Sequence, residues 1–109
     1  MLKKENRLAK SKDIQTAFAR GRTFFNPLFN IKFIPRPQSI KFTVVVSTKV
    51  FKNATDRNRL KRVIREYLRL NLKSFRHGDY VIITKPKLRQ FPEAEVLKEF
   101  KLLCAKLHL

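Results

Sequence analysis

The stretch DRNRLKRVIREYLR, residues 56–69, carries two patterns at once. Five of the nine residues from 57 to 65 are Arg or Lys, yet apolar residues recur among them at helical spacing. At 100° per residue the apolar side chains fall within an arc of about 140°, and a separate arc of about 100° holds cations and one amide. The apolar arc contains Leu60, Val63, Ile64, Tyr67 and Leu68, and the second arc contains Asn58, Lys61, Arg62, Arg65 and Arg69. We therefore predict a helix that packs one face on a core and offers the other to a polyanion.

A solvated helix laced with ion pairs is the alternative interpretation of this stretch. Asp56 and Glu66 are the only acids between residues 53 and 73, too few to pair with the cations around them. Like charges four residues apart, such as Lys61 and Arg65, cost roughly a few tenths of a kcal/mol each when nothing neutralises them. Phosphate groups would supply the missing charge, and the arginine fork matches them. The pattern favours the binding face.

The net charge of the whole chain indicates the same kind of partner. Its 109 residues suit one domain over 1–109, and 26 Lys and Arg stand against 8 Asp and Glu, a formal charge of +18 at pH 7. Self-repulsion at this level destabilises a compact protein, while solubility needs only a small net charge. We expect a nucleic-acid partner rather than a merely solubilising surface.

Few residues are suited to other chemistry. Cys104 is the only cysteine, which excludes an internal disulfide and a Cys-rich zinc site and fits a reducing, cytoplasmic location. His77 and His108 lie far apart, and the acids are too scattered to hold Mg²⁺, so we expect no metal site and no catalytic residue in the protein itself. MLKKENRLAK at the start lacks the apolar stretch of a secretory signal, and no apolar run is long enough to cross a membrane.

The residues before the basic helix predict one helix and two strands. A helix over 12–20 is ended by Gly21. Residues 28–34 alternate with one strongly apolar face, and residues 41–47 are rich in β-branched Val. Because few residues separate the two strands, we expect an antiparallel hairpin. The valines at 44–46 suggest burial on both faces of the second strand.

The residues after the basic helix predict a strand and a last helix. Residues 79–85 form a third strand that Pro86 stops, and Pro92 opens a helix with acids in its first turn, where the helix dipole favours them. The predicted order is helix, strand, strand, helix, strand, helix, an α+β fold in one domain.

The segment KNATDRNRLKRVIRE, residues 52–66, resembles the signature of the bacterial ribonuclease P protein subunit. That family carries Arg-Asn-Arg, a hydrophobe, Lys-Arg, two hydrophobes and then Arg-Glu or Arg-Gln. Three further segments are similar to the family's N-terminal part, second strand and third strand: NRLAKSKDIQTAFARG (6–21), VVVSTKV (44–50) and HGDYVIITKP (77–86). The resemblance covers nearly the whole chain.

The resemblance implies both a fold and a function. The fold is an α/β sandwich of order αββαβα, with an uncommon left-handed crossover between the second and third strands, where the general rule favours a right-handed one. The function is that of a protein subunit that assists a catalytic RNA, ribonuclease P RNA, in removing the 5′ leader from precursor tRNA. Mg²⁺ then acts at the active site of the RNA, and the protein alone is inactive.

The resemblance also implies two groups of site residues. Those that match the RNA-contacting motif are Arg57, Asn58, Arg59, Lys61, Arg62 and Arg65, and Arg69 continues their face of the helix. A cleft between the first helix and the sheet holds the leader, with Phe18, Lys32 and Val45 at the matching positions. The cleft departs from the family at Ile14, where Phe is usual, at Lys32, where an aromatic residue is common, and at Val45, where a small polar residue often sits. Phe18 can stack on a nucleotide or belong to the core, and the sequence leaves both open.

Two other classes of function compete with this one. An RNA-binding structural protein, such as a ribosomal protein with no processing role, would fit the charge and the order of elements, but the Arg-Asn-Arg-x-Lys-Arg motif favours the ribonuclease P subunit. A protein-only nuclease would need clustered carboxylates, which the sequence lacks.

Overall fold

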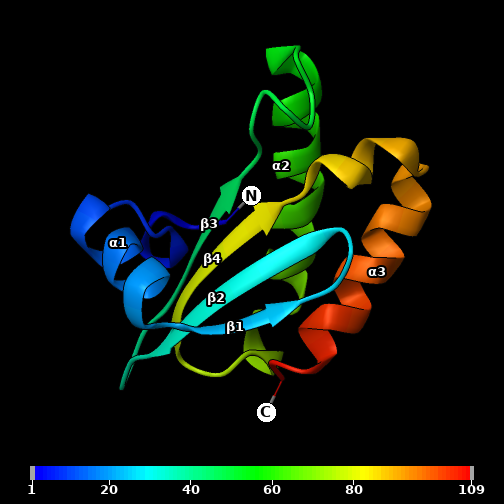
Figure 1. Cartoon of the computed structure of the whole chain (residues 1–109). Coiled ribbons are helices and arrows are strands. Elements are labelled where there is room, and N and C mark those ends of the chain that lie inside the picture. The colour runs from blue at the N-terminus through cyan, green and yellow to red at the C-terminus, as the bar shows by residue number, and fades with distance from the viewer. Residues whose placement is uncertain (1, 109) are drawn as a thin grey trace.

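A four-stranded sheet carries helices on both of its faces (Figure 1). The computed structural model describes residues 2–108. Along the chain its elements are a short 3₁₀ helix η1 (Lys4–Asn6), α1 (Ser11–Arg20), β1 (Arg22–Phe25), β2 (Phe29–Pro35), β3 (Ile40–Val45), α2 (Ala54–Leu70), η2 (Leu72–Ser74), β4 (Gly78–Thr84), η3 (Pro86–Gln90) and α3 (Glu93–Ala105). The predicted α+β fold and its αββαβα order are confirmed, with the short strand β1 added.

The predicted hairpin of β2 and β3 was wrong, because β4 lies between them. The sheet order is β1-β2-β4-β3, with β2 antiparallel and β3 parallel to β4. Both neighbours reach Gly78 at the start of β4, where Pro35 of β2 and Ile40 of β3 are its partners. Residues 78–82 of β4 are buried, because Tyr80 and Ile82 pack in the larger core cluster on one face while Val81 packs with Ala17 of α1 on the other.

The strand that sequence analysis missed, β1, forms a hairpin with β2. Its turn is held by Asn26, whose side-chain Oδ1 accepts hydrogen bonds from the backbone N–H groups of Leu28 and Phe29, at 3.0 and 2.8 Å. Such a turn is typical of Asn. Before β1, Gly21 ends α1 where a side chain would collide with the backbone, since an added Cβ would lie 2.4 Å from the carbonyl oxygen of Ala17.

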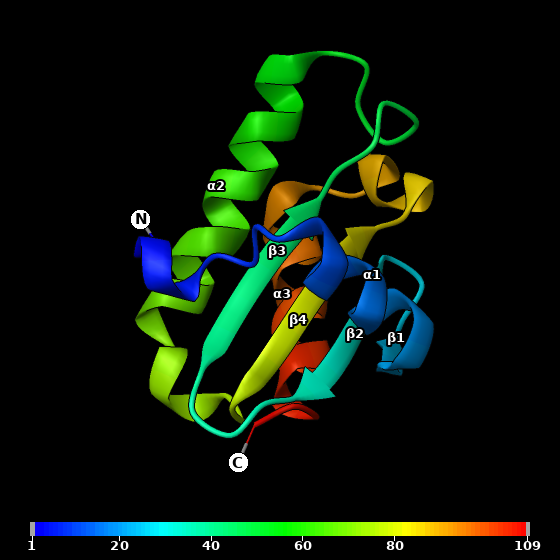
Figure 2. The same ribbon diagram turned by 90° about the vertical axis from the view of Figure 1, so that its left-hand side faces the viewer.

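The crossover from β3 through α2 to β4 is left-handed, as the resemblance implied. In Figure 1 the two parallel strands point upward, β4 lies to the right of β3, and α2 lies behind the sheet. Figure 2, turned by 90°, places α2 on one side of the sheet and α1 on the other. A right-handed connection between the same strands would place α2 on the side of α1.

The two faces of the sheet differ in chemistry. The face toward α2 and α3 carries the main core, with large side chains such as Phe29, Ile31 and Phe42 buried. Tyr80 lies at its centre and stacks on Phe42, with ring centroids 4.9 Å apart. The face toward α1 has a smaller cluster around Leu8, Ala17 and Val81. The expected burial of β3 on both faces was wrong: Val44 and Val46 are buried in the main core, but Val45 points to the opposite face and is 38 % exposed.

The orientation of α2 agrees with the apolar arc in its sequence. Leu60, Ile64 and Leu68 are buried against the sheet and α3, while Val63 and Tyr67, on one side of the arc, are half-buried. The helix therefore turns its basic face away from the core.

Two leucines near the end of α2 test this orientation. Leu68 is fully buried and Leu70 is 66 % exposed. We expect Leu68→Ala to lower the free energy of unfolding by about 2–5 kcal/mol, because it leaves a cavity in the core. Leu70→Ala should change it by no more than about 0.5 kcal/mol. Urea unfolding followed by circular dichroism measures both, and similar losses in the two variants would contradict the orientation of α2.

Candidate nucleic-acid interface

The basic face of α2 borders an open groove. Asn58, Arg62 and Arg65 line it from α2 together with Glu66, and Arg7 lines it from the N-terminal segment. The groove has a volume of about 520 Å³. Its four polar helix residues recur at spacings of four, three and one, so they share one side of the helix. Three guanidinium groups from two segments converge on this groove, an arrangement suited to phosphate groups.

Arg7 reaches the groove because the N-terminal segment pairs with the outer edge of β3. The backbone N–H of Leu8 donates to the carbonyl of Phe42, and the side-chain amide of Asn6 donates to the carbonyl of Ile40, both at 2.8 Å. Leu2 is buried in the main core. Arg7 itself donates from Nε and Nη2 to the carbonyl of Leu2, which orients its side chain. Figure 2 shows the segment crossing in front of β3, between α2 and α1.

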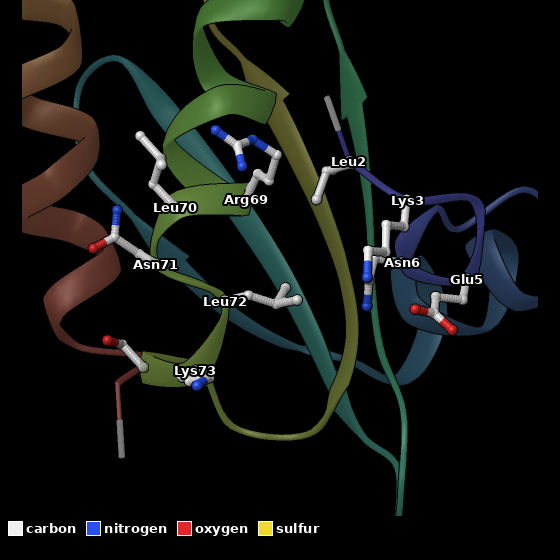
Figure 3. A pocket seen from close by; sticks show the side chains of 10 residues that line it. Leu2, Lys3, Glu5, Asn6, Arg69, Leu70, Asn71, Leu72 and Lys73 are labelled. Carbon is white, nitrogen blue, oxygen red and sulfur yellow. The ribbon is translucent and has the colours of Figure 1, made fainter.

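A second hollow continues the surface toward the C-terminal end of α2 (Figure 3). It has a volume of about 690 Å³. Figure 3 shows Arg69 on α2 and Lys3 on the N-terminal segment at its two sides, with Lys73 beyond the end of the helix. The cationic surface thus extends along the length of α2.

The structure separates the seven RNA-contact residues predicted from the sequence into those already engaged and those available. Arg57 donates from Nη1 to the carbonyls of Phe51 and Lys52, at 2.9 and 2.7 Å, so it braces the turn before α2. Arg59 pairs with Glu93 on α3, with Nη2 and Oε2 3.2 Å apart. Arg69 donates to Glu66 one turn earlier in α2.

Asn58, Lys61, Arg62 and Arg65 form the available group. Across residues 2–108 no hydrogen bond or ion pair from their side chains to another residue is present in the structure. The hydrogen bonds from Arg69 lower the pKa of Glu66 to about 2, so Glu66 is ionised at neutral pH and partly offsets the charge at one end of the face. The middle of α2 therefore offers the uncompensated positive charge.

The predicted leader-cleft residues lie around the face of the sheet that α1 covers only in part. Cross-strand pairing places Thr23, Lys32, Val81 and Thr43 in one row across this face, and Phe25, Asn30, Ile83 and Val45 in the next. Lys32 and Val45 thus share one face from neighbouring rows. Lys32 donates from Nζ to the hydroxyl of Thr23, at 2.7 Å. Phe18 on α1 is 45 % exposed, so it is not a core residue.

Contacts at two places hold α1 on this face. Ala17 is buried against Leu8 and Val81. At the other end, Arg36 donates from Nε to the buried Asp79 at 2.9 Å, and its Nη2 lies 4.0 Å from Asp13 in the first turn of α1. Phe18 follows the buried Ala17, so the anchored helix carries this exposed ring about 100° round its axis from the side that packs on the sheet.

The face around Phe18 is almost free of negative charge. The sequence has no Asp or Glu from residue 14 to residue 55, a range that includes β1, β2 and β3. On β4 the one acid is Asp79, which is buried and paired with Arg36. A polyanion can therefore cover this face without meeting an exposed carboxylate from the strands.

Other chemistry has little support within residues 2–108. No group of three or more His, Cys, Asp or Glu side chains lies together as metal ligands would. Cys104 is buried in the main core, and burial raises the pKa of its thiol, so it is inert. No helix in this part of the chain is long and apolar enough to span a bilayer.

Sequence reasoning missed Arg7 as a member of the groove. Residues 6–8 carry no sequence pattern that predicts pairing with an edge of the sheet. They are placed there by two hydrogen bonds to β3 and by the burial of Leu2, which a local pattern does not reveal. The one signal available was the similarity of the N-terminal Arg-Leu to the family.

Fold and surface together define a small basic protein with surfaces suited to RNA. One face of α2 offers arginines, and α1 presents an exposed aromatic ring beside an acid-poor face of the sheet.

The family model for Ribonuclease P matches residues 2–108, and the chain belongs to this family. It is 37 % identical over 101 residues to the "Ribonuclease P protein component" of an Exiguobacterium species, over 92 % of this chain and 88 % of that protein. The solved RNase P protein from Thermotoga maritima superposes with a TM-score of 0.77 at 29 % identity, covering 93 % of this chain and 94 % of that one. The RNase P protein of Staphylococcus aureus shares the fold, with a TM-score of 0.87 over 97 % of this chain and all of that one, at 23 % identity. The subunit identity expected from the sequence is confirmed, and the ribosomal alternative is not supported.

The available and engaged arginines of α2 should behave differently when they are removed. We expect Arg62→Ala and Arg65→Ala each to weaken RNA binding and to reduce the slope of log affinity against log salt by about one unit, because each removes a phosphate contact. Folding should be unaffected, since neither side chain holds another residue. Fluorescence anisotropy over a salt series measures the slope.

Arg57→Ala is the matched comparison on the same helix. It removes two hydrogen bonds to backbone carbonyls, and we expect it to lower the free energy of unfolding by about 1–3 kcal/mol. If Arg62→Ala and Arg65→Ala destabilised the fold as much as Arg57→Ala while the salt slope stayed constant, the division into engaged and available residues would be wrong.

Proposed function

We propose that the chain is the accessory protein of ribonuclease P, which binds the catalytic RNA through α2 and the N-terminal segment and the 5′ leader of precursor tRNA through the open face of the sheet. The RNA then carries out the cleavage that produces the mature tRNA 5′ end, and the protein alone is inactive. We place this activity in the cytoplasm.

The observation that carries the proposal is a pair of surfaces with different chemistry, one along α2 and one on the face of the sheet that α1 covers only in part. On one side the available Arg62 and Arg65 lie with Arg7 in an open groove. On the other side Phe18 and Val45 are exposed on an acid-poor face. A structured RNA presents a dense array of phosphates, which suits the first surface, and an unpaired leader presents separate bases, which suit the second.

The protein's contribution to the reaction is electrostatic and positional. Cations along α2 neutralise closely packed phosphates, which lowers the divalent-ion concentration that the folded RNA requires. We assign the Mg²⁺ of the reaction to the RNA, because the residues described here provide no cluster of ligands for it. An exposed ring at Phe18 and a cation at Lys32 would hold the leader and so orient the scissile bond relative to that centre.

Reconstitution with a bacterial ribonuclease P RNA tests the proposal. We expect no cleavage of precursor tRNA by the protein alone at any Mg²⁺ concentration, and 5′-matured tRNA from the protein with the RNA at Mg²⁺ concentrations too low for the RNA alone. The products are resolved by gel electrophoresis. RNA-free cleavage that EDTA abolishes would contradict the proposal and indicate a protein nuclease.

The leader site has its own prediction. Stacking of a base on an aromatic ring contributes roughly 1–3 kcal/mol, so Phe18→Ala should weaken binding of precursor tRNA to the holoenzyme by about 5- to 100-fold. Binding of mature tRNA should not change, because it has no leader. Lys32→Ala should act in the same direction, with an effect that fades at high salt.

Competition binding with precursor and mature tRNA separates these cases. Since Phe18 is 45 % exposed, its removal should leave the circular dichroism spectrum and the unfolding midpoint near those of the wild type. Equal losses for the two tRNAs would remove Phe18 from the leader site.

A further inference from the structure

Phe25 on β1 is an exposed aromatic ring on the same face of the sheet as Lys32. It is 66 % exposed, more than Phe18. Its cross-strand partner is Asn30, whose neighbours Phe29 and Ile31 point into the main core, so Asn30 and Phe25 point to the opposite face. Lys32 is the diagonal neighbour of Phe25 across β1 and β2, at roughly 7–8 Å for such a pair.

A cation is already held beside this ring. Nζ of Lys85 lies 5.5 Å from the centre of the Phe25 ring and donates to the carbonyl of Asn26 at 2.7 Å. Lys85 directly follows β4, and its backbone N–H donates to the carbonyl of Leu28, which fixes it next to the β1–β2 turn. A ring, an ammonium group and the amide of Asn30 are thus gathered at one end of the open face.

This group has the composition of a nucleotide site. An aromatic ring stacks on any base, and an adjacent ammonium group attracts the phosphate that follows it. A folded domain gains nothing in stability from leaving a Phe ring two-thirds exposed, whereas a stacking surface must be exposed. The absence of acids from residue 14 to residue 55 disfavours a basic protein partner at the same place.

We propose that Phe25 and Lys85 form a second stacking position for an unpaired leader nucleotide, separate from the one at Phe18. The inference rests on the proposed function, because it takes the leader as its ligand. Phe18 lies on α1 and Phe25 lies on the edge strand β1, diagonal to Lys32, so the two rings would hold different nucleotides of one leader. Positions 14 and 32 are occupied by Ile and Lys, which have no aromatic ring. Phe25 supplies a ring from β1, the strand next to the one that carries Lys32.

Precursor tRNAs whose leaders grow by one nucleotide at a time test this position. We expect Phe25→Ala to bind the shortest leaders as the wild-type holoenzyme does and to bind longer ones on the order of five- to tenfold more weakly, once the leader reaches β1. Phe18→Ala and Phe25→Ala should begin to weaken binding at different leader lengths, because the two rings lie on different elements. With 2-aminopurine at successive leader positions, one position should be quenched in the wild type and released in Phe25→Ala.

Two variants serve as controls. Phe25→Tyr keeps a stacking ring and should restore both the affinity and the quenching. Leu102→Ala removes another exposed apolar side chain, 57 % exposed on α3, and should have no effect at any leader length.

The outcomes distinguish this inference from the proposed function. If the wild-type protein promotes cleavage with the RNA but Phe25→Ala binds every leader like the wild type, the second stacking position is wrong and the proposed function stands. Equal weakening for all leader lengths and for mature tRNA would also overturn it. If the wild-type protein does not promote cleavage, the proposed function fails and takes this inference with it.

Discussion

The packing of one stripe of α2 on the sheet decides what the rest of the molecule can do. Leu60, Ile64 and Leu68 are buried in the main core, and their burial sets the rotation of the helix about its axis. Arg62 and Arg65 line the groove as a consequence, and within residues 2–108 no hydrogen bond or ion pair to another side chain or carbonyl holds them there. A rigid core on one side thus gives the other side a fixed array of cations. This arrangement lowers the entropy lost when RNA binds, because the backbone of the binding face is already ordered.

The positive charges of α2 repel one another, and carboxylates neutralise them near the two ends of the helix but not in its middle. Glu93 pairs with Arg59 near the start of α2, and Glu66 pairs with Arg69 near its end. These exposed pairs contribute little to stability in themselves. Their effect is on distribution, because they concentrate the unneutralised charge on the central turns, where Arg7 adds to it from the N-terminal segment. The open face of the sheet differs from α2 in its charge, because it has few charged side chains of either sign and exposed aromatic rings between them.

The sequence predicted those parts of the molecule that depend on local periodicity. The amphipathic pattern of α2 and the alternation along β2 correspond to faces that are buried in the structure. The pairing of the strands was not predictable in this way, because it depends on which strand buries both of its faces, and β4 took the centre that a simple hairpin would have given to β2 and β3. Exposure was misjudged for the same reason. Val44 and Val45 at the end of β3 and Val46 directly after it have the same propensity, but only Val45 faces the side that α1 leaves open. The motif predicted which residues lie on the basic face. It could not separate Arg57, which donates to two backbone carbonyls, from Arg62, whose side chain bonds to no other residue among those the structure describes.

The unusual hand of the β3–α2–β4 connection has a consequence for which surface remains for single-stranded RNA. With this order and direction of strands, the common hand would have laid α2 across the face that bears Lys32 and Val45. The large aromatic rings of the main core would then not have been covered by α2. The longest helix instead packs on the face with the larger core cluster, and the short α1 and Leu8 of the N-terminal segment cover only part of the second face. The open face that we propose for the leader is therefore a product of topology, present whatever side chains that face carries. We expect sequence change there to alter which nucleotides are bound without rebuilding the fold.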